Sequence, residues 1–295
     1  MESTTHHSEA GQLLTVFIKP VNHAFSSPEK IQREWDQLNY LEPPEFEKAQ
    51  EEYEQFQKLL EKSGVEVHLL PSDESTSLDS MYCRDAAILT EQGAILCNMG
   101  KEERKVEPSV IRKAFEKENI PILGEITSPG TLEGGDVAWI DERTLAVGHS
   151  YRTNEEGIKQ LKDLLEPLEV EIIVVPLPHY KGPSDVFHLM SIFSPVDYDL
   201  AVVYSPLMPI VFRQLLYRRG YQLVEVPEDE FESMGCNVLA TGPRSCILVE
   251  GNPKTELLLR QRGCRVMTYP GEEISVKGGG GPTCLTRPVL RKRLF

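Results

Sequence analysis

One short unit recurs along this sequence and restricts the folds open to it. A charged amphipathic segment leads into a polar or glycine-containing turn, and a short apolar run then stops at a proline or a polar residue. The turn and the apolar run end at residues 71, 124, 176, 227 and 270, so the steps are 53, 52, 51 and 43 residues. A period near 50 residues is typical of propellers and repeat arrays. Five near-equal steps favour a closed ring of five αβ units over an ordinary α/β sheet.

The segments between the repeated units are predicted to form further helices and strands of the same domain. Residues 46–61 place apolar side chains at helical spacing, with Glu and Lys on the opposite side. No low-complexity or Gly/Ser-rich linker divides the chain, so we expect one domain over residues 1–295. Further short strands are predicted at 13–19, 86–89, 94–97, 137–140, 145–147, 200–203, 238–240 and 246–249.

Charge and composition limit the partners of the protein. Its 295 residues include 31 Lys and Arg against 46 Asp and Glu, which gives a formal net charge of −15. An acidic chain is a poor match for nucleic acids and anionic membranes, which attract Lys and Arg, whereas a cationic substrate suits it. No apolar run approaches the roughly 18 residues of a membrane-spanning helix. We therefore expect neither nucleic acid nor membrane as a partner.

The six cysteines are scattered along the chain, and no two of them form a C-x-x-C pair. The first dozen residues are polar and do not resemble a signal peptide. We therefore expect free thiols in a cytoplasmic protein.

Four local strings carry side chains suited to catalysis. Cys284 follows a run of four glycines and a proline, where the backbone can approach a ligand closely. His188 lies in Phe-His-Leu-Met-Ser, and Glu133 lies in Thr-Leu-Glu-Gly-Gly-Asp before an apolar strand. Arg84 and Asp85 open another strand. Each string also has an ordinary interpretation: a buried thiol, a hydrogen-bonded core histidine, an acidic turn or a surface ion pair.

Together these side chains suit catalysis by a nucleophilic cysteine. Such a site needs a thiolate, a general acid and base, and a group that orients the electrophile. Carboxylates near a thiol raise its pKa, which hinders attack unless the substrate is itself a cation. A guanidinium meets this condition because its N–H donors pair with carboxylates and its charge stabilises the neighbouring thiolate.

At this point the sequence resembles a known superfamily. Leu-Glu-Gly-Gly-Asp, Gly-His-Ser-Tyr-Arg-Thr-Asn, His-Leu-x-Ser and Gly-Gly-Pro-Thr-Cys occur in the order seen in the guanidine-modifying (amidinotransferase, or pentein) superfamily. The sequence is most similar to the dimethylarginine dimethylaminohydrolases, with arginine deiminases next, and the match runs from about residue 79 to the C-terminus. The resemblance implies a five-bladed α/β propeller (the pentein fold) with pseudo-fivefold repeats and a central active site.

The resemblance also implies catalytic roles. Cys284 would be the nucleophile, and His188 would act first as general acid and then as general base. Glu133 would bind the guanidinium and orient His188. Neither a metal nor an organic cofactor is expected, because the substrate brings its own activated cation.

Four further residues correspond to substrate-binding positions of the family. Asp85 would bind guanidinium nitrogens, and Asp79 matches an acid that the dimethylarginine enzymes also use. Arg152 matches the arginine that clamps the α-carboxylate of the substrate. Arg104 stands where the family has a second arginine.

The implied reaction hydrolyses the guanidino group of Nω-methylated arginine to citrulline and an alkylamine, through a covalent thiouronium on the cysteine. Arginine deiminases carry a second Asp two residues after the histidine; here that position is Met190, which leaves room for N-alkyl groups. Arg84 and the Gly-Gly-Pro before Thr283 instead resemble the deiminase and amidinotransferase branches, so both activities stay open.

An alternative from another class is a non-catalytic propeller that binds a partner. A scaffold would not need Cys284, His188 and Glu133 together, which argues against it. We also expect the Pro20–Phe25 loop to cover the site, and a homodimer is left open.

Overall fold

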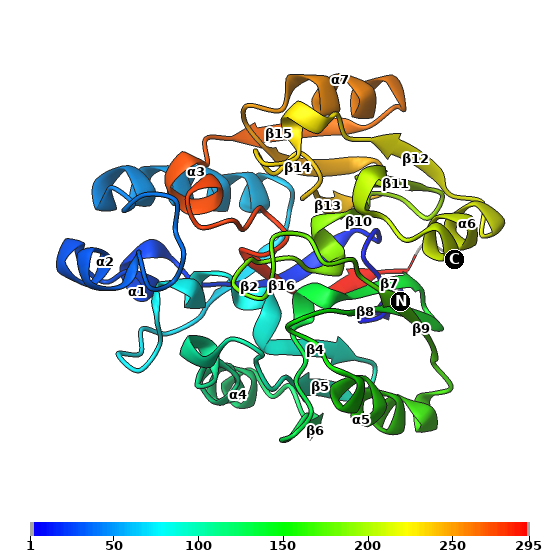
Figure 1. Cartoon of the computed structure of the whole chain (residues 1–295), viewed down its shortest axis with the longest axis horizontal. Coiled ribbons are helices and arrows are strands. Elements are labelled where there is room, and N and C mark those ends of the chain that lie inside the picture. Colours follow the sequence, from blue (N-terminus) through cyan, green and yellow to red (C-terminus); the bar gives the residue numbers. More distant parts are fainter. Residues whose placement is uncertain (1–2, 294–295) are drawn as a thin grey trace.

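The computed structural model describes residues 3–293, and its five small sheets stand around a common centre as the blades of a propeller (Figure 1). In four blades, three consecutive strands pair in order: the first antiparallel with the second, and the second parallel with the third. The first strand of each blade lies nearest the centre. These blades are β4 (Ala87–Thr90), β5 (Gly93–Leu96) and β6 (Ile122–Glu125); β7 (Val137–Asp141), β8 (Thr144–His149) and β9 (Glu171–Pro176); β10 (Phe193–Pro195), β11 (Leu200–Val203) and β12 (Gln222–Glu225); and β13 (Leu239–Gly242), β14 (Ser245–Val249) and β15 (Arg265–Tyr269).

The fifth blade contains both ends of the described chain. β16 (Thr286–Lys292) takes the place of the first strand and pairs antiparallel with β2 (Leu13–Ile18). β2 in turn pairs parallel with β3 (Glu66–Leu69), and the short β1 (Thr4–Thr5) pairs with the other edge of β16. Figure 1 shows β2 and β16, blue beside red, near the centre of the molecule. The pairing of the chain ends therefore closes the ring.

Helices lie on the outside of the ring, where they connect the second strand of each blade to the third (Figure 1). Two parallel neighbours need such a crossover, because a tight turn can join only antiparallel strands. In the fifth blade three helices share the connection. The helices are α1 (Val21–Ala24), α2 (Pro28–Glu34), α3 (Phe46–Lys62), α4 (Glu107–Lys117), α5 (Glu155–Leu165), α6 (Ile210–Arg218) and α7 (Pro253–Gln261).

The α5 helix illustrates why these segments fold as they do. Asn154 caps it, since its side chain accepts a hydrogen bond from the N–H of Gly157 at 2.8 Å. Ile158, Leu161 and Leu165 recur at helical spacing and are all buried. Similar apolar faces cover the other sheets, so the core lies between strands and helices rather than in one central mass.

The structure confirms the predicted five-bladed propeller. The five repeated apolar runs are β3, β6, β9, β12 and β15, the third strand of every blade, so the period of the sequence is the period of the blades. The other predicted strands agree with the structure to within two residues at either end. Three strands were not predicted: β1, β10 and β16. Two of these contain a proline, which cannot donate a backbone hydrogen bond to a sheet.

Within residues 3–293, no helix combines the length and the apolar character needed to cross a bilayer. The six cysteines, all of which lie in this range, are free, as predicted.

Candidate active site

Each blade contributes one polar side chain to the centre of the ring, just before its first strand begins. Because the first strands converge at the centre, the residues that lead into them meet there. These residues are Asp85 before β4, Glu133 before β7, His188 before β10, Asn237 before β13 and Cys284 before β16.

A cavity of about 150 Å³ opens among these residues. Six of the seven predicted site residues line it, and Glu133 lies behind them, fully buried at 0% exposure. The structure therefore brings together residues that are scattered over the sequence. The six lining residues are Asp79, Asp85, Arg104, Arg152, His188 and Cys284.

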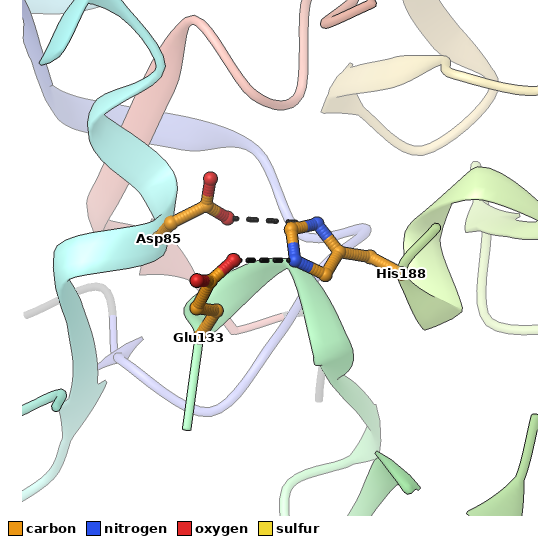
Figure 2. A group of neighbouring side chains, drawn as sticks. All are labelled: Asp85, Glu133 and His188. Carbon is orange, nitrogen blue, oxygen red and sulfur yellow. Dashed lines mark hydrogen bonds and ion pairs between the residues drawn. The ribbon is translucent and has the colours of Figure 1, made fainter. Parts of the chain in front are cut away.

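Glu133 and His188 form the central contact of the site (Figure 2). His188 Nε2 lies 2.8 Å from Glu133 Oε2, and the backbone N–H groups of Gly100 and Lys101 donate to Glu133 Oε1 at 3.0 and 3.1 Å. Burial alone would raise the pKa of Glu133, but its hydrogen bond to His188 and the positive charges of His188 and Arg152 hold it well below its usual range. The carboxylate is therefore ionised.

Three neighbouring carboxylates keep the imidazole charged. Burial alone would lower the pKa of His188, but the surrounding carboxylates of Asp136, Asp85 and Glu133 raise it to about 9. At neutral pH His188 is therefore an imidazolium, which is the form that a general acid requires.

The two glycines after Glu133 allow this close packing. A Cβ on Gly135 would lie 2.4 Å from His188 Nδ1 and 2.7 Å from Asp85 Oδ1. A Cβ on Gly134 would lie 2.3 Å from the carbonyl oxygen of Arg84. Only glycine leaves room for the acid and the imidazole at these positions.

Asp85 presents one free carboxylate oxygen at the cavity. Its Oδ2 accepts a 2.5 Å hydrogen bond from Arg104 Nη1, and Arg104 also binds both carboxylate oxygens of Glu107 at 2.9 and 2.8 Å. Asp85 Oδ1 is buried without a hydrogen-bond partner and lies 3.9 Å from His188 Nδ1 (Figure 2). A buried acceptor without a partner is unfavourable, so this oxygen is suited to receive a donor from a ligand.

Two more of the predicted residues are already paired inside the protein. Lys101 Nζ lies 2.6 Å from Asp79 Oδ2, and both side chains are buried. Arg152 Nη1 lies 3.5 Å from Glu133 Oε1, and Arg152 is 4% exposed. Of the two predicted arginines, Arg152 therefore has fewer contacts than Arg104 within the protein.

Cys284 differs from the other cysteines, because it alone among the six is not fully buried. Burial and the charge of Asp85 raise the pKa of its thiol to about 11, while the side-chain hydrogen bond of Asn237 and the charge of Arg84 act in the opposite direction. Asn237 Nδ2 lies 3.2 Å from the sulfur. The thiol is thus neutral in the free protein and needs a nearby cation to ionise.

Asp85, Glu133 and His188 also each offer an atom that could bind a metal ion, within 4.8 Å of one another. These groups are engaged elsewhere: Glu133 Oε2 contacts His188 Nε2, and Asp85 Oδ2 binds Arg104. Glu133 and His188 therefore form a hydrogen-bonded pair with Asp85 beside it, and one carboxylate oxygen of each acid is already in use.

The expectation that the Pro20–Phe25 loop covers the site is wrong. The predicted cover, Pro20–Phe25, does not line the cavity; it forms α1, where His23 Nδ1 contacts the carbonyl oxygen of Leu70 at 2.8 Å. Residues that do line it include Leu38, Asn39 and Leu41 before α3, and Tyr180, Lys181 and residues 184–188 before β10. Apolar Val21 and Ala24 face the core instead and hold α1 against it.

With this geometry established, the chain can be compared with known proteins. The family described as N,N-dimethylarginine dimethylhydrolase, eukaryotic, matches residues 20–291. The chain belongs to this family. The predicted resemblance to the guanidine-modifying superfamily is therefore confirmed, and with it an enzyme of the class that hydrolyses C–N bonds in guanidino groups.

Relatives of this dimethylarginine dimethylhydrolase family member extend over most of the chain. The N(G),N(G)-dimethylarginine dimethylaminohydrolase of Pseudomonas aeruginosa is 27% identical over 248 residues, covering 84% of this chain and 91% of that protein. An arginine deiminase of Listeria welshimeri is 26% identical over 255 residues, covering 72% of this chain and 62% of the deiminase. A solved structure of a variant of the Pseudomonas enzyme, complexed with citrulline, matches with a TM-score of 0.75 and 24% identity, over 94% of this chain and 99% of that one.

Three polar residues of this family member contribute to the site besides the seven predicted site residues. Lys101 neutralises Asp79, and Asp136 accepts the N–H of Leu189 at 3.0 Å beside His188. Asn237 contacts the thiol. Asn237 had one available signal: it stands just before a predicted strand, as Asp85 does.

Proposed function

We propose that this chain hydrolyses the guanidino group of Nω-methylated arginine to citrulline and an alkylamine. One arrangement carries the proposal: the Cys284 thiol, the free Oδ1 of Asp85 and the His188–Glu133 pair meet at one cavity. They would supply a nucleophile, an acceptor for a cation and a general acid, which are the parts that the reaction needs.

Substrate binding follows from the charges at the cavity. The guanidinium would donate to Asp85 Oδ1, which has no hydrogen-bond partner inside the protein. Met190 also lines the cavity, so alkyl groups on a terminal nitrogen would meet an apolar side chain where a deiminase has an acid. We propose that Arg152 binds the α-carboxylate. Asp79, paired with Lys101, and Arg104, paired with Asp85, would also contribute to substrate binding.

The proposed reaction begins when the substrate cation lowers the pKa of the Cys284 thiol, which then loses its proton to solvent. The thiolate adds to the guanidinium carbon, and His188 gives its proton to the departing alkylamine, leaving a covalent thiouronium. Water then gives a proton to His188 and adds to the same carbon. The C–S bond breaks to regenerate the thiolate, the added hydroxyl gives its proton to solvent as it becomes the ureido carbonyl, and the released alkylamine takes up a proton from solvent. Overall, water and the substrate cation yield a neutral ureido group and an alkylammonium ion, and these steps use no metal or organic cofactor.

A paired assay tests the proposal. The protein is incubated separately with asymmetric dimethylarginine and with arginine, and dimethylamine, ammonia and citrulline are measured. We expect dimethylamine and citrulline in equal amounts, with ammonia release from arginine much slower. Faster ammonia release would identify an arginine deiminase, and product only with an added acceptor amine would identify an amidinotransferase. No product in any arm would favour the non-catalytic binding protein.

The nucleophile has its own prediction. Cys284→Ser is expected to lose essentially all turnover yet still bind the substrate, because a hydroxyl without a strong base is a poor nucleophile. Cys264→Ser, at a cysteine outside the cavity, is the matched control and should keep the wild-type rate. Mass spectrometry should find the covalent adduct on wild-type Cys284. Wild-type turnover by Cys284→Ser would overturn the mechanism.

The location of the protein is also part of the proposal. Six free cysteines fit a reducing compartment such as the cytoplasm.

A further inference from the structure

Asn237 occupies, in the β13–β15 blade, the position that Asp85, His188 and Cys284 occupy in their own blades. It lies two residues before β13 and is 6% exposed. Its side chain reaches the central cavity, which it lines together with the other three. The architecture therefore places Asn237 at the centre as a fifth polar side chain, and the proposed reaction steps do not use it.

The contacts of Asn237 determine how its amide is oriented. The backbone N–H of Thr283 donates to Asn237 Oδ1 at 3.0 Å, so the oxygen end of the amide faces Thr283. The NH₂ end then faces Cys284 Sγ, at 3.2 Å from Nδ2. An amide NH₂ can only donate, so the sulfur is the acceptor in this contact. A thiolate accepts hydrogen bonds more strongly than a neutral thiol does.

The glycine run before Cys284 makes room for this contact. A Cβ on Gly281 would lie 2.6 Å from Asn237 Cγ and 2.7 Å from its Oδ1. Gly281, the fourth glycine of the run, is therefore required for steric reasons, since any larger residue would displace the Asn237 amide from the sulfur.

The surroundings of the sulfur disfavour its ionised form, so a hydrogen-bond donor to the sulfur would favour the thiolate. The nearby carboxylate disfavours the thiolate, and burial does so as well. Arg84 favours the thiolate through its charge, but its Nη2 is bound to Glu9. The charged and titratable groups that act on the sulfur electrostatically are Asp85, Arg84, Tyr82 and Tyr269. The other titratable groups that line its cavity are Asp79, Lys101, Arg104, Arg152, Tyr180, Lys181, Asp185, His188, Glu232, Cys236 and Lys277.

We propose that Asn237 stabilises the thiolate of Cys284 by donating a hydrogen bond to its sulfur, and that it holds the sulfur in position for attack. This inference deepens the proposed function and rests on it, because the thiolate is the proposed nucleophile. The bond to Thr283 fixes the amide, so the donor is in place before a substrate arrives.

Two variants separate this role from a merely structural one. Asn237→Asp keeps an acceptor for the Thr283 N–H but removes the N–H donor to sulfur and adds a negative charge beside it, whereas Asn237→Ala removes donor and acceptor without adding charge. Asn98→Ala is the matched control, because the Asn98 amide donates to the carbonyl oxygen of Gly130 and not to a sulfur. Thermal unfolding shows that each variant is folded.

The measurement is the rate at which iodoacetamide alkylates Cys284, followed by mass spectrometry at several pH values. Well below the thiol pKa this rate is proportional to the thiolate fraction, and loss of a charge-assisted hydrogen bond corresponds to about one pH unit or more. We therefore expect both Asn237 variants to react at least about tenfold more slowly at pH 8, and Asn98→Ala to react as the wild type does.

Two results would overturn the inference. Wild-type alkylation rates in both Asn237 variants would show that the amide does not stabilise the thiolate. Loss in Asn237→Ala alone would show that its importance lies in the Thr283 contact. Dimethylamine release by the wild-type protein is measured in parallel. Its absence would refute the proposed function, while the alkylation comparison would still decide the role of Asn237.

Discussion

The contact between Glu133 and His188 shows how single residues set the chemistry of this site. Both side chains are buried, which disfavours their charged forms. His188 nevertheless keeps its charge beside the carboxylates of Asp136, Asp85 and Glu133, and Glu133 keeps its charge beside His188, 2.8 Å away, and Arg152. A buried pair of this kind is sensitive to the loss of either member. It is also sensitive to pH.

The pH dependence has a definite sign. The pKa of folded His188, about 9, lies above the usual value of 6.5, so its charge stabilises the folded state fully below about pH 6.5. That contribution is lost as the pH rises through about 9. We expect Glu133→Gln to lower the pKa of His188, because a neutral amide cannot stabilise the imidazolium as a carboxylate does. The loss of stability then moves to lower pH.

An NMR titration of the imidazole and urea unfolding between pH 6 and pH 10 would check this prediction. Glu116→Gln, at an exposed position, is the control and should leave both curves unchanged. An unaltered imidazole titration in Glu133→Gln would show that Glu133 does not contribute to the raised pKa of His188.

At the scale of secondary-structure elements, turns at the strand and helix ends carry the functional side chains. The turn between β8 and α5 is an example. Asn154 accepts the N–H groups of Thr131 and Gly157 at 3.0 and 2.8 Å and donates to the carbonyl oxygen of Pro129 at 2.9 Å. In the same turn, Thr153 accepts the N–H of Glu133 at 3.2 Å. The turn that caps α5 thus also helps to position Glu133.

We expect Asn154→Ala to lower the free energy of unfolding by about 1–2 kcal/mol, because the helix loses its cap. Asn154→Asp should lose less, since a carboxylate also accepts the N–H of Gly157 at the positive end of the helix dipole. Urea unfolding would measure both values, with an unchanged dependence on urea concentration. Equal stability of Asn154→Ala and wild type would show that the cap contributes nothing.

At the scale of the whole molecule, the segment before β2 joins parts of the ring that are distant in sequence. Glu9 Oε1 accepts a 2.7 Å hydrogen bond from Arg84 Nη2 and lies 3.4 Å from the backbone nitrogen of Trp139 in β7. The ring of His7 stacks on Trp139 with 3.9 Å between centroids. Arg84 therefore does not pair with its sequence neighbour Asp85, as the surface ion pair interpretation would have it.

Glu9 is the acid that balances several buried arginines. Burial and the charge of Arg84 lower the pKa of Arg287 to about 9, and Glu9 acts against this. Burial likewise lowers the pKa of Arg291 to about 10, again opposed by Glu9. Without Glu9 these cations would be left close together inside the protein.

Glu9→Gln is therefore expected to lower the free energy of unfolding by about 3–5 kcal/mol, as is usual when one partner of a buried ion pair is removed. The double variant Glu9→Gln, Arg84→Met should lose less than the sum of the two single variants. Glu54→Gln removes an exposed partner of Lys58 and should change the free energy of unfolding by no more than about 1 kcal/mol. Strictly additive effects of the Glu9 and Arg84 substitutions would show that the pair is not coupled.

The sequence by itself determined the architecture of the blades and most of the side chains at their centre. The third strand of each blade and the helix before it have local signatures, because apolar spacing and turn residues depend on near neighbours. Cys284, His188 and Glu133 were found because each lies in a short motif next to glycines or at the edge of a strand. The extent of the domain, residues 1–295, stays a prediction.

Only the tertiary structure decided which residues far apart in the sequence meet. The pairing of β16 with β2, the bonds of Arg104 to Asp85 and of Lys101 to Asp79, and the contact of Asn237 with Cys284 have no local signature. The same holds for the lining of the cavity, to which Pro20–Phe25 does not contribute. Hydrogen bonds and ion pairs depend on distance in space, and closing the ring sets those distances.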